Sequence, residues 1–329
     1  MRTALIKSTG MYVPERVLTN RYFNELLGED VGSWLEENLT IRQRHWCGEG
    51  ESTADLCTAV GVEALQRAGL QATDLDMIII ATDTPEYVSP STAAVVQHRL
   101  GAQHAGTFDI NTACAGFVTA LDVGSKYLIA DTRYRYILVI GAYAMSKYLD
   151  KTDKKTVTLF ADGAAGVILE AGDPRQGGFL TSRLHSEGQY HDWMGIYGGG
   201  THLPITAEVL EAKDHLLKFV HKFPKELNPR VWRQMVLDMC AELQIRPGEV
   251  DHYFFTQINI NSIFETLDPL EVDRSKAHTI MDRYGYTGSA CIPMALDDAV
   301  KSGKVRRGDL LFLIGSGGGL AFASAAFRY

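Results

Sequence analysis

Two kinds of hydrophobic pattern alternate along the chain. Runs of β-branched and aromatic residues within 70–84 and 245–259 predict buried strands, each preceded by a polar loop. Apolar residues spaced three and four apart in 52–69 and 230–244 predict amphipathic helices, and a Ser-Thr pair at the start of the first helix predicts its cap. The same order of helix, loop and strand thus occurs twice, which indicates an internal repeat.

A second pair of segments extends this repeat. Residues 112–142 match 289–317: each has a cysteine after small residues, a helix containing Ala-Leu-Asp, a polar loop and a buried strand. Alternating strands and helices predict βαβ units and mostly parallel sheets. We therefore predict an α/β fold with five layers, α/β/α/β/α, made of two pseudo-twofold-related halves at 1–172 and 173–329. Cys114 and Cys291 are both expected at helix starts near the pseudo-axis.

Composition narrows the class of protein. The 329 residues are 46% apolar and 22% charged, which is typical of a globular protein, and the net charge of −8 argues against non-specific wrapping of nucleic acid. Five scattered cysteines without a CxxC pair fit a reducing compartment, and ten histidines show no HExxH motif, so we expect no metal site.

One uncharged stretch, Leu310–Phe327, has nearly the length of a membrane span. Glycines at 315 and 317–319 interrupt it, and they favour a turn between two buried strands. We therefore expect a cytoplasmic protein with no membrane span.

The segment FDINTACAGF at 108–117 holds the first of the two paired cysteines. A helix start favours the thiolate form of Cys114 and is expected to lower its pKa. The small neighbours Ala113, Ala115 and Gly116 leave room for a substrate. Cys114 is therefore a candidate nucleophile, with an inert buried thiol as the alternative.

Five segments carry a specific resemblance. FDINTACAGF, together with IRQRH, LFADGAAG, GYTGSACIPMALDDAV and GSGGG, resembles β-ketoacyl-acyl carrier protein synthase III of the thiolase superfamily. The resemblance implies that Cys114 takes an acyl group from a thioester of coenzyme A or of acyl carrier protein. It also implies oxyanion donors at the amides of Cys114 and Gly318, no tightly bound cofactor, and a coenzyme A or phosphopantetheine thioester as substrate.

The chain departs from that family at two positions. Thr256, in DHYFFTQIN, stands where the family has its catalytic histidine, and Tyr286, in GYTGSA, stands where it has its asparagine, whereas Asn259 is retained. Each hydroxyl can donate a hydrogen bond to a thioester carbonyl, but neither is a base at neutral pH. Acylation of Cys114 is therefore expected to survive better than decarboxylative condensation.

The resemblance also implies a homodimer in which the loop at 83–91 reaches the partner's site. Glu86 on this loop is a candidate base, with a solvated loop glutamate as the alternative, and the small Ser89 would admit a bulkier acyl primer. Trp34 matches a family tryptophan that stacks on the adenine of coenzyme A, although Asn38 replaces the neighbouring arginine.

Three readings of function stay open at this point. The leading one is an acyltransferase of specialised lipid or polyketide-like metabolism. A second is a conventional synthase that starts fatty acid synthesis, and a third is a non-catalytic partner subunit. A basic run after residue 212 suits an acidic carrier protein or merely a solvated surface, and a histidine in the loop 185–202 is a further candidate for the site.

Overall fold

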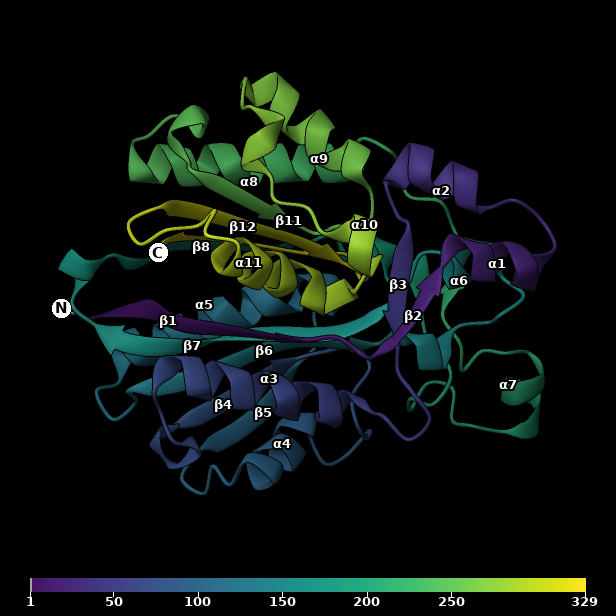
Figure 1. Ribbon diagram of the computed structural model, residues 1–329, viewed down its shortest axis with the longest axis horizontal. Coiled ribbons are helices and arrows are strands. Elements are labelled where there is room, and N and C mark those ends of the chain that lie inside the picture. The colour runs from purple at the N-terminus through teal and green to yellow at the C-terminus, as the bar shows by residue number, and fades with distance from the viewer. Residues whose placement is uncertain (1) are drawn as a thin grey trace.

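The computed structural model describes residues 2–329, and its elements alternate between strands and helices as the repeat predicts. Two large β-sheets lie at the centre of the molecule, one above the other in Figure 1. The strands of one sheet come from residues 3–172, and those of the other from residues 178–328. Each half of the repeat therefore supplies one sheet.

The first sheet has five strands in the order β1-β7-β6-β4-β5. In it, β4 runs parallel to β5 and β6, and β7 runs antiparallel to β1 and β6. The bounds are β1 Thr3–Tyr12, β4 Met77–Ala81, β5 Gly106–Ile110, β6 Tyr136–Ala144 and β7 Asp162–Gly172.

The second sheet has four strands in the order β11-β12-β13-β8, of which only β11 and β12 are parallel. Its strands are β8 Gly178–Ser186, β11 His252–Phe255, β12 Leu310–Gly317 and β13 Ala321–Arg328. The prediction of mostly parallel sheets is wrong, since three of the seven pairings in the two large sheets are parallel. The reason is that each half ends on a strand that turns back on its neighbour, and a turn of three residues between β12 and β13 permits only an antiparallel pair.

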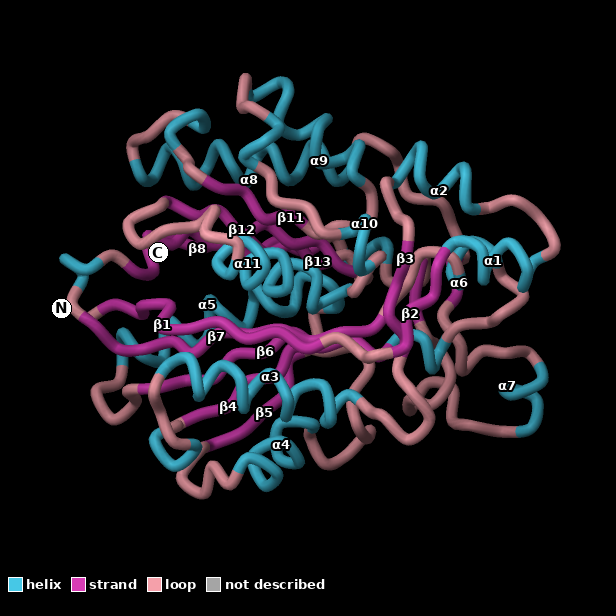
Figure 2. The backbone as a smooth tube through the Cα atoms, viewed as in Figure 1, coloured by secondary structure: helices cyan, strands magenta, loops and turns pink. Residues whose placement is uncertain are grey.

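Helices complete five layers, which confirms the predicted α/β/α/β/α architecture. Two helices lie between the sheets, two cover the outer face of the first sheet, and two cover the outer face of the second (Figures 1 and 2). The helices between the sheets are α5 Gly116–Ala130 and α11 Cys291–Lys301. Those on the outer face of the first sheet are α3 Thr53–Ala68 and α4 Thr92–Leu100. Those on the outer face of the second sheet are α8 Leu227–Leu243 and α9 Ile260–Leu267.

The central position of α5 explains its composition, because a helix enclosed on all sides is apolar all round. The segment Ala113–Ala130 is the one helix in the described part of the chain that is long and apolar enough to cross a membrane, and 67% of it is buried inside the protein. That burial is what a core helix shows. The stretch 310–327 forms the hairpin of β12 and β13, as predicted.

Smaller elements form a lobe at one end of the molecule, to the right in Figure 1. Two two-stranded sheets and four short helices belong to it, and α10 Met281–Tyr284 connects it to the second half. Their bounds are β2 Arg16–Thr19, α1 Asn20–Leu27, α2 Gly32–Leu39, β3 Gln43–Trp46, α6 Lys154–Val157, β9 Met194–Gly195, α7 Ala207–Glu211 and β10 Lys218–Phe219.

Candidate active site

Cys114 lies in a short 3₁₀ turn, Ala113–Ala115, that joins β5 to α5. Ala113 has φ +46°, a left-handed conformation that is rare for a residue with a Cβ atom and marks a sharp, strained turn. On its other side the turn rests against β12, where a Cβ atom on Gly317 would stand 2.5 Å from the Cys114 amide nitrogen. Only glycine fits there, and this contact holds the cysteine backbone in place.

The Cys114 thiol is buried, with 2% of the residue exposed. Burial raises its pKa well above the ordinary value, and the nearby Asp83 charge raises it further, whereas the Tyr286 hydroxyl and the cysteine's own amide favour the thiolate. The prediction of a lowered pKa at the helix start is therefore wrong for the resting enzyme. Loss of water around the sulfur outweighs the groups that favour its charge.

Tyr286 lies close to Cys114, and its hydroxyl favours the charged form of the cysteine sulfur. Its ring packs between Tyr143 and Phe160, with centroid distances of 6.5 and 5.4 Å. Its backbone is held by bonds to the segment 159–161 on both sides, N to Leu159 O at 3.0 Å and O from Ala161 N at 2.8 Å. Burial raises the pKa of this phenol well above 10, so at neutral pH Tyr286 is a hydrogen-bond donor.

The second paired cysteine, Cys291, begins α11 as predicted, and it is buried close to Cys114. The Gln257 backbone amide lies near its sulfur and favours the thiolate form, although burial raises the pKa of this thiol overall. The two helices between the sheets thus both start beside this site.

Thr256 follows β11 and is fully buried. Its hydroxyl donates to the Ser316 carbonyl at 3.3 Å and accepts from the Ser316 amide at 2.9 Å. In this structure the hydroxyl proton is directed at β12, so its donation to a substrate carbonyl stays a prediction that requires the hydroxyl to turn. The side-chain oxygen of Asn259 is also engaged within the protein: it accepts a hydrogen bond from the Asn261 backbone amide at 3.0 Å and so caps α9.

A cavity of about 710 Å³ opens above the thiol. We call it the inner cavity, and six predicted site residues line it together: Cys114, Thr256, Tyr286, Asn259, Gly318 and Trp34. Gly318 sits on its wall between β12 and β13, where a Cβ atom would come no closer than 3.5 Å to any neighbour. Cys114 and Gly318, the two residues expected to supply oxyanion donors, therefore line one cavity.

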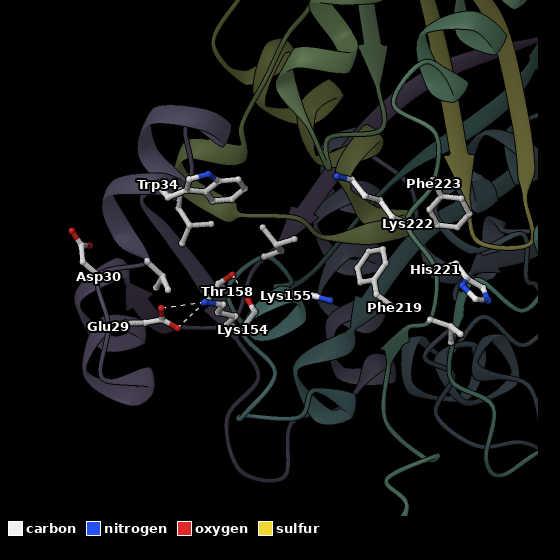
Figure 3. A pocket seen from close by; sticks show the side chains of 14 residues that line it. Glu29, Asp30, Trp34, Lys154, Lys155, Thr158, Phe219, His221, Lys222 and Phe223 are labelled. Carbon is white, nitrogen blue, oxygen red and sulfur yellow. Dashed lines mark hydrogen bonds and ion pairs between the residues drawn. The ribbon is translucent and has the colours of Figure 1, made fainter.

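Figure 3 shows the side chains that line a second cavity of about 660 Å³, the outer cavity, which adjoins the first because the two share lining residues. The two share five lining residues, which are Trp34, Leu159, Phe219, Lys222 and Phe223. Trp34 on α2 is 57% exposed, and Asn38 one turn on donates to its carbonyl at 2.9 Å. Lys154 in this cavity pairs with Glu29 at 3.1 Å, while Lys155 and Lys222 form no ion pair within residues 2–329.

Glu86 and Ser89 do not line either cavity. The Glu86 carboxylate accepts from Ser52 Oγ at 3.0 Å and from the Ala54 amide at 2.9 Å, and it stands 3.9 Å from the Arg99 guanidinium. Within its own subunit it therefore caps the start of α3, and both oxygens are engaged. Ser89 is exposed beside Tyr87 and Val88, which are 53% and 92% exposed.

Sequence reasoning missed Asp83, three residues before Glu86. It follows the end of β4, and burial raises its pKa from 3.8 to about 6. Its negative charge acts on the Cys114 sulfur and raises the pKa of that thiol. The signal for it was an aspartate directly after a buried parallel strand, at the sheet edge where the neighbouring strand leads to Cys114.

The three candidate histidines, His185, His191 and His202, line neither cavity. His185 is half-exposed and 3.6 Å from Glu187, and neither His191 nor His202 lines the inner cavity. No group of three or more His, Cys, Asp or Glu side chains in metal-binding arrangement occurs in the part of the chain that the structure describes.

The five layers and a cysteine at the start of a central helix define the class, a thiolase-fold protein with the site of an acyl-transferring enzyme. Two family profiles match, "3-Oxoacyl-[acyl-carrier-protein (ACP)] synthase III" over 108–188 and its C-terminal counterpart over 240–329. The chain is 36% identical over 329 residues to the beta-ketoacyl-[acyl-carrier-protein] synthase III of Roseiflexus castenholzii, covering 99% of this chain and 98% of the other, and 32% identical over 324 residues to that of Clostridioides difficile, covering 98% of each.

Solved structures agree. The 3-oxoacyl-[acyl-carrier-protein] synthase III of Aquifex aeolicus VF5 superposes with a TM-score of 0.88 and 30% identity, over 99% of this chain and all of the other. The corresponding synthase of Pseudomonas aeruginosa PAO1 superposes with a TM-score of 0.90 and 27% identity, over 99% and 98%. The protein belongs to the 3-oxoacyl-[acyl-carrier-protein] synthase III family.

Proposed function

We propose that this enzyme takes an acyl group from a thioester onto Cys114 and then passes it to a second substrate. The observation that carries the proposal is one cavity in which the Cys114 thiol, the Tyr286 hydroxyl and the Gly318 backbone meet. The retained cysteine argues against a non-catalytic partner subunit, because such a subunit has no use for a strained turn that presents a thiol.

The acylation step follows from the chemistry of these groups. The Cys114 thiol loses its proton, its sulfur forms a bond to the thioester carbonyl carbon, and the carbonyl oxygen becomes an oxyanion that the Cys114 and Gly318 amides stabilise. The intermediate collapses by breaking the bond to the donor sulfur, which leaves with a proton as a free thiol. Tyr286 donates to the cysteine sulfur while it is charged.

The donor is a thioester of coenzyme A or of the phosphopantetheine arm of an acyl carrier protein. Such donors carry phosphates, and Lys155 and Lys222, which have no ion pair within the described residues, line the outer cavity together with the exposed Trp34. The arm would run from there into the inner cavity through the residues shared by both. The substrate itself brings the reactive thioester, so the proposal includes no tightly bound cofactor.

Tyr286 and Thr256 argue against the ordinary second step. Decarboxylative condensation needs two donors to the thioester carbonyl of the extender, and the Thr256 proton is already used by Ser316. We therefore infer transfer or condensation in specialised lipid or polyketide-like metabolism, in the cytoplasm. The conventional synthase reaction is the second candidate, favoured by identity of 36% to a synthase of that name.

We further propose a homodimer formed around the loop 83–91. The exposed apolar side chains of Tyr87 and Val88 on that loop support it, because such side chains favour a partner over water. In a dimer this loop would lie near the partner's site, and Ser89 would there leave room for a bulky acyl group. Glu86 would keep its capping bonds to α3.

Intact-protein mass spectrometry tests the proposal. Incubation with acyl-coenzyme A and acyl-carrier thioesters of graded chain length is expected to add one acyl mass, and Cys114→Ala is expected to abolish it. Cys291→Ala is the matched control, because the Cys291 thiol is as buried as that of Cys114 and also lies at the start of a central helix. The Cys291→Ala variant should still gain one acyl mass. If no donor labels the wild type, the partner-subunit reading becomes the better one.

A further inference from the structure

Arg44 on β3 is a buried arginine that none of the steps above uses. The residue is 0% exposed, and no carboxylate in residues 2–329 forms an ion pair with it. Its Nε atom is enclosed and has no hydrogen-bond partner in the same range. Burial lowers the pKa of Arg44 to about 9, so the guanidinium still carries its charge at pH 7. A buried charge without a counter-ion is costly, so its presence calls for an explanation.

Two side chains of α1 hold the guanidinium in one orientation. Its Nη1 atom donates to Asn20 Oδ1 at 2.6 Å, and its central carbon lies 4.2 Å from the centre of the Phe23 ring. The Phe23 ring also packs edge-on against Trp46, two residues along β3 from Arg44, with 5.5 Å between the ring centres. Residues two apart on a strand share a face, so Arg44 and Trp46 form one ordered pair of donors.

This pair of donors binds the segment 158–161, which connects α6 to β7. The Arg44 Nη2 atom donates to the Thr158 carbonyl, and the Trp46 Nε1 atom donates to the Phe160 carbonyl at 3.0 Å. All four of these residues are buried, so water does not compete for the two bonds. The segment is therefore fastened to β3 at two points.

The remaining groups of the same segment bind the backbone of Tyr286. The Leu159 carbonyl accepts from the Tyr286 amide at 3.0 Å, and the Ala161 amide donates to the Tyr286 carbonyl at 2.8 Å. Bonds to β3, at 158 and 160, thus alternate with bonds to Tyr286, at 159 and 161. The position of Tyr286 relative to β3 is set by these four bonds together.

The chain just before Tyr286 also contacts β3. Gly285 has φ +63°, and a Cβ atom on it would lie 3.0 Å from the Arg44 Cβ atom. The amide of Arg42, the residue before β3, donates to the Asp282 carbonyl at 3.1 Å. Tyr286 is therefore fixed both through the segment 158–161 and through the residues that precede it.

We propose that Arg44, together with Trp46, is a positioning residue that fixes Tyr286 on the wall of the inner cavity beside Cys114. Tyr286 and Cys114 both line that cavity. Ring packing alone is not directional, whereas hydrogen bonds to the backbone are, so these bonds decide where the Tyr286 hydroxyl stands. The inference rests on the proposed function only for the use of that hydroxyl in acylation, since the positioning itself needs no thioester.

Alkylation of Cys114 by iodoacetamide tests the inference without any thioester. The rate is followed by intact mass at pH 8, with Cys114→Ala giving the background from the other free cysteines. Because the Tyr286 hydroxyl favours the charged sulfur, Tyr286→Phe should slow alkylation about tenfold. Arg44→Met removes the donors and keeps a long side chain, and it should slow alkylation by a similar factor. In the double variant the rate should equal that of Tyr286→Phe alone.

Two further variants grade the effect, and a third is the control. Arg44→Lys keeps the charge and one donor group, so it should restore part of the rate that Arg44→Met loses. Trp46→Phe removes the indole donor alone and should slow alkylation less than Arg44→Met, with no further slowing in the Tyr286→Phe background. If Arg44→Met does not fold, the Trp46→Phe comparison decides. Arg42→Met is the matched control, because the Arg42 side chain is 73% exposed, and its rate should not change.

A purely structural role of Arg44 predicts a different result. Loss of Arg44 would then loosen the packing around Cys114, and alkylation would become faster whether or not the Tyr286 hydroxyl is present. A faster or unchanged rate overturns the inference, and so does a slowing of equal size in the Tyr286→Phe background. If thioesters fail to acylate the wild type while alkylation follows the predicted pattern, the proposed function is wrong and the positioning role stands.

Discussion

Burial sets the chemistry of individual side chains at this site. Cys114, Tyr143 and Tyr286 are each at most 2% exposed, and burial raises the pKa of all three well above the ordinary values. Each of these groups is therefore neutral at rest, and one shared charge, on Asp83, acts on Cys114 and Tyr143. Cys114 is thus a neutral thiol at rest rather than a standing thiolate.

A stability prediction follows for Asp83. Its pKa is raised from 3.8 in the unfolded chain to about 6 in the fold, so the folded state binds the proton more tightly and the ionised form costs stability above pH 6. At about 1.4 kcal/mol per unit this is on the order of 3 kcal/mol at most. Asp83→Asn should therefore be more stable than the wild type at pH 8, and the difference should disappear as the pH falls below about 4.

Denaturant unfolding of both proteins at pH 4, 6 and 8 checks this. Asp162→Asn is an informative contrast, because that buried carboxylate accepts from the Cys47 and Ser146 amides at 2.6 and 2.8 Å. Losing those bonds should destabilise the fold. Lower stability of Asp83→Asn at pH 8 would show that Asp83 has a structural partner instead.

At the scale of elements, the site is a contact between a turn and a hairpin. The turn from β5 to α5 presents Cys114, and the hairpin of β12 and β13 supplies Gly317 and Gly318. Gly317 supports the cysteine backbone, whereas Gly318 faces the cavity. The two adjacent glycines therefore have different surroundings, one packed on the Cys114 turn and one facing the cavity.

Alanine at each position separates these roles. A Cβ atom at Gly317 would meet the Cys114 nitrogen at 2.5 Å and the Thr112 oxygen at 2.6 Å, so Gly317→Ala should lose roughly 1–3 kcal/mol of stability and most acylation. Gly318→Ala meets nothing closer than 3.5 Å, so its melting temperature should match the wild type while its acylation slows. Equal stability of both variants would contradict the close packing of Gly317 on the turn.

At the scale of the whole molecule, positive charge gathers at one cavity although the protein as a whole is negatively charged. The chain carries a net charge of −8, yet Lys155 and Lys222 in the outer cavity have no ion pair with any residue of the described range 2–329 (Figure 3). Other lysines of the predicted basic run are neutralised, Lys213 by Asp150 at 2.7 Å and Lys218 by Asp214. A local cationic entrance on an acidic protein favours an anionic donor over other solutes.

Donor affinity should follow this charge. Lys155→Ala and Lys222→Ala should each raise the KM for an acyl-coenzyme A about two- to fivefold with little change in kcat, and the effect should shrink in high salt. Lys213→Ala is the matched control, because its charge is already paired, and its KM should not change. Steady-state kinetics at two salt concentrations test this prediction. Unchanged KM values for Lys155→Ala and Lys222→Ala would argue against donor phosphates in the outer cavity.

Much of this architecture could be predicted from the sequence. The repeated hydrophobic pattern predicted the layers, and motif matching placed Cys114, Gly318, Thr256 and Tyr286, which the structure brings into one cavity. The hydrogen-bond partners of these side chains could not be predicted from the sequence, because they are distant along the chain: Thr256 bonds to Ser316, sixty residues away. The same holds for the Cys114 pKa, since the degree of burial arises from contacts between the two halves.

Residues 83–86 show this limit most clearly. The motif directed attention to Glu86, which the fold uses to cap α3, while Asp83 is the carboxylate that acts on the thiol. Both residues lie on one short loop, and only the path of the chain after β4 decides which carboxylate bonds to the start of α3 and which acts on the thiol. Such a choice depends on tertiary structure and has no local signature.

The central claim is that Cys114 carries the acyl group between two substrates. Its most direct test is to load the enzyme with an isotopically labelled acyl-coenzyme A, digest it with protease, and locate the label by peptide mass spectrometry before and after addition of an acceptor thioester. We predict label on the peptide containing Cys114, none on that containing Cys291, and its loss when the acceptor is added. Label on Cys291, or a Cys114 adduct that no acceptor removes, would contradict the account.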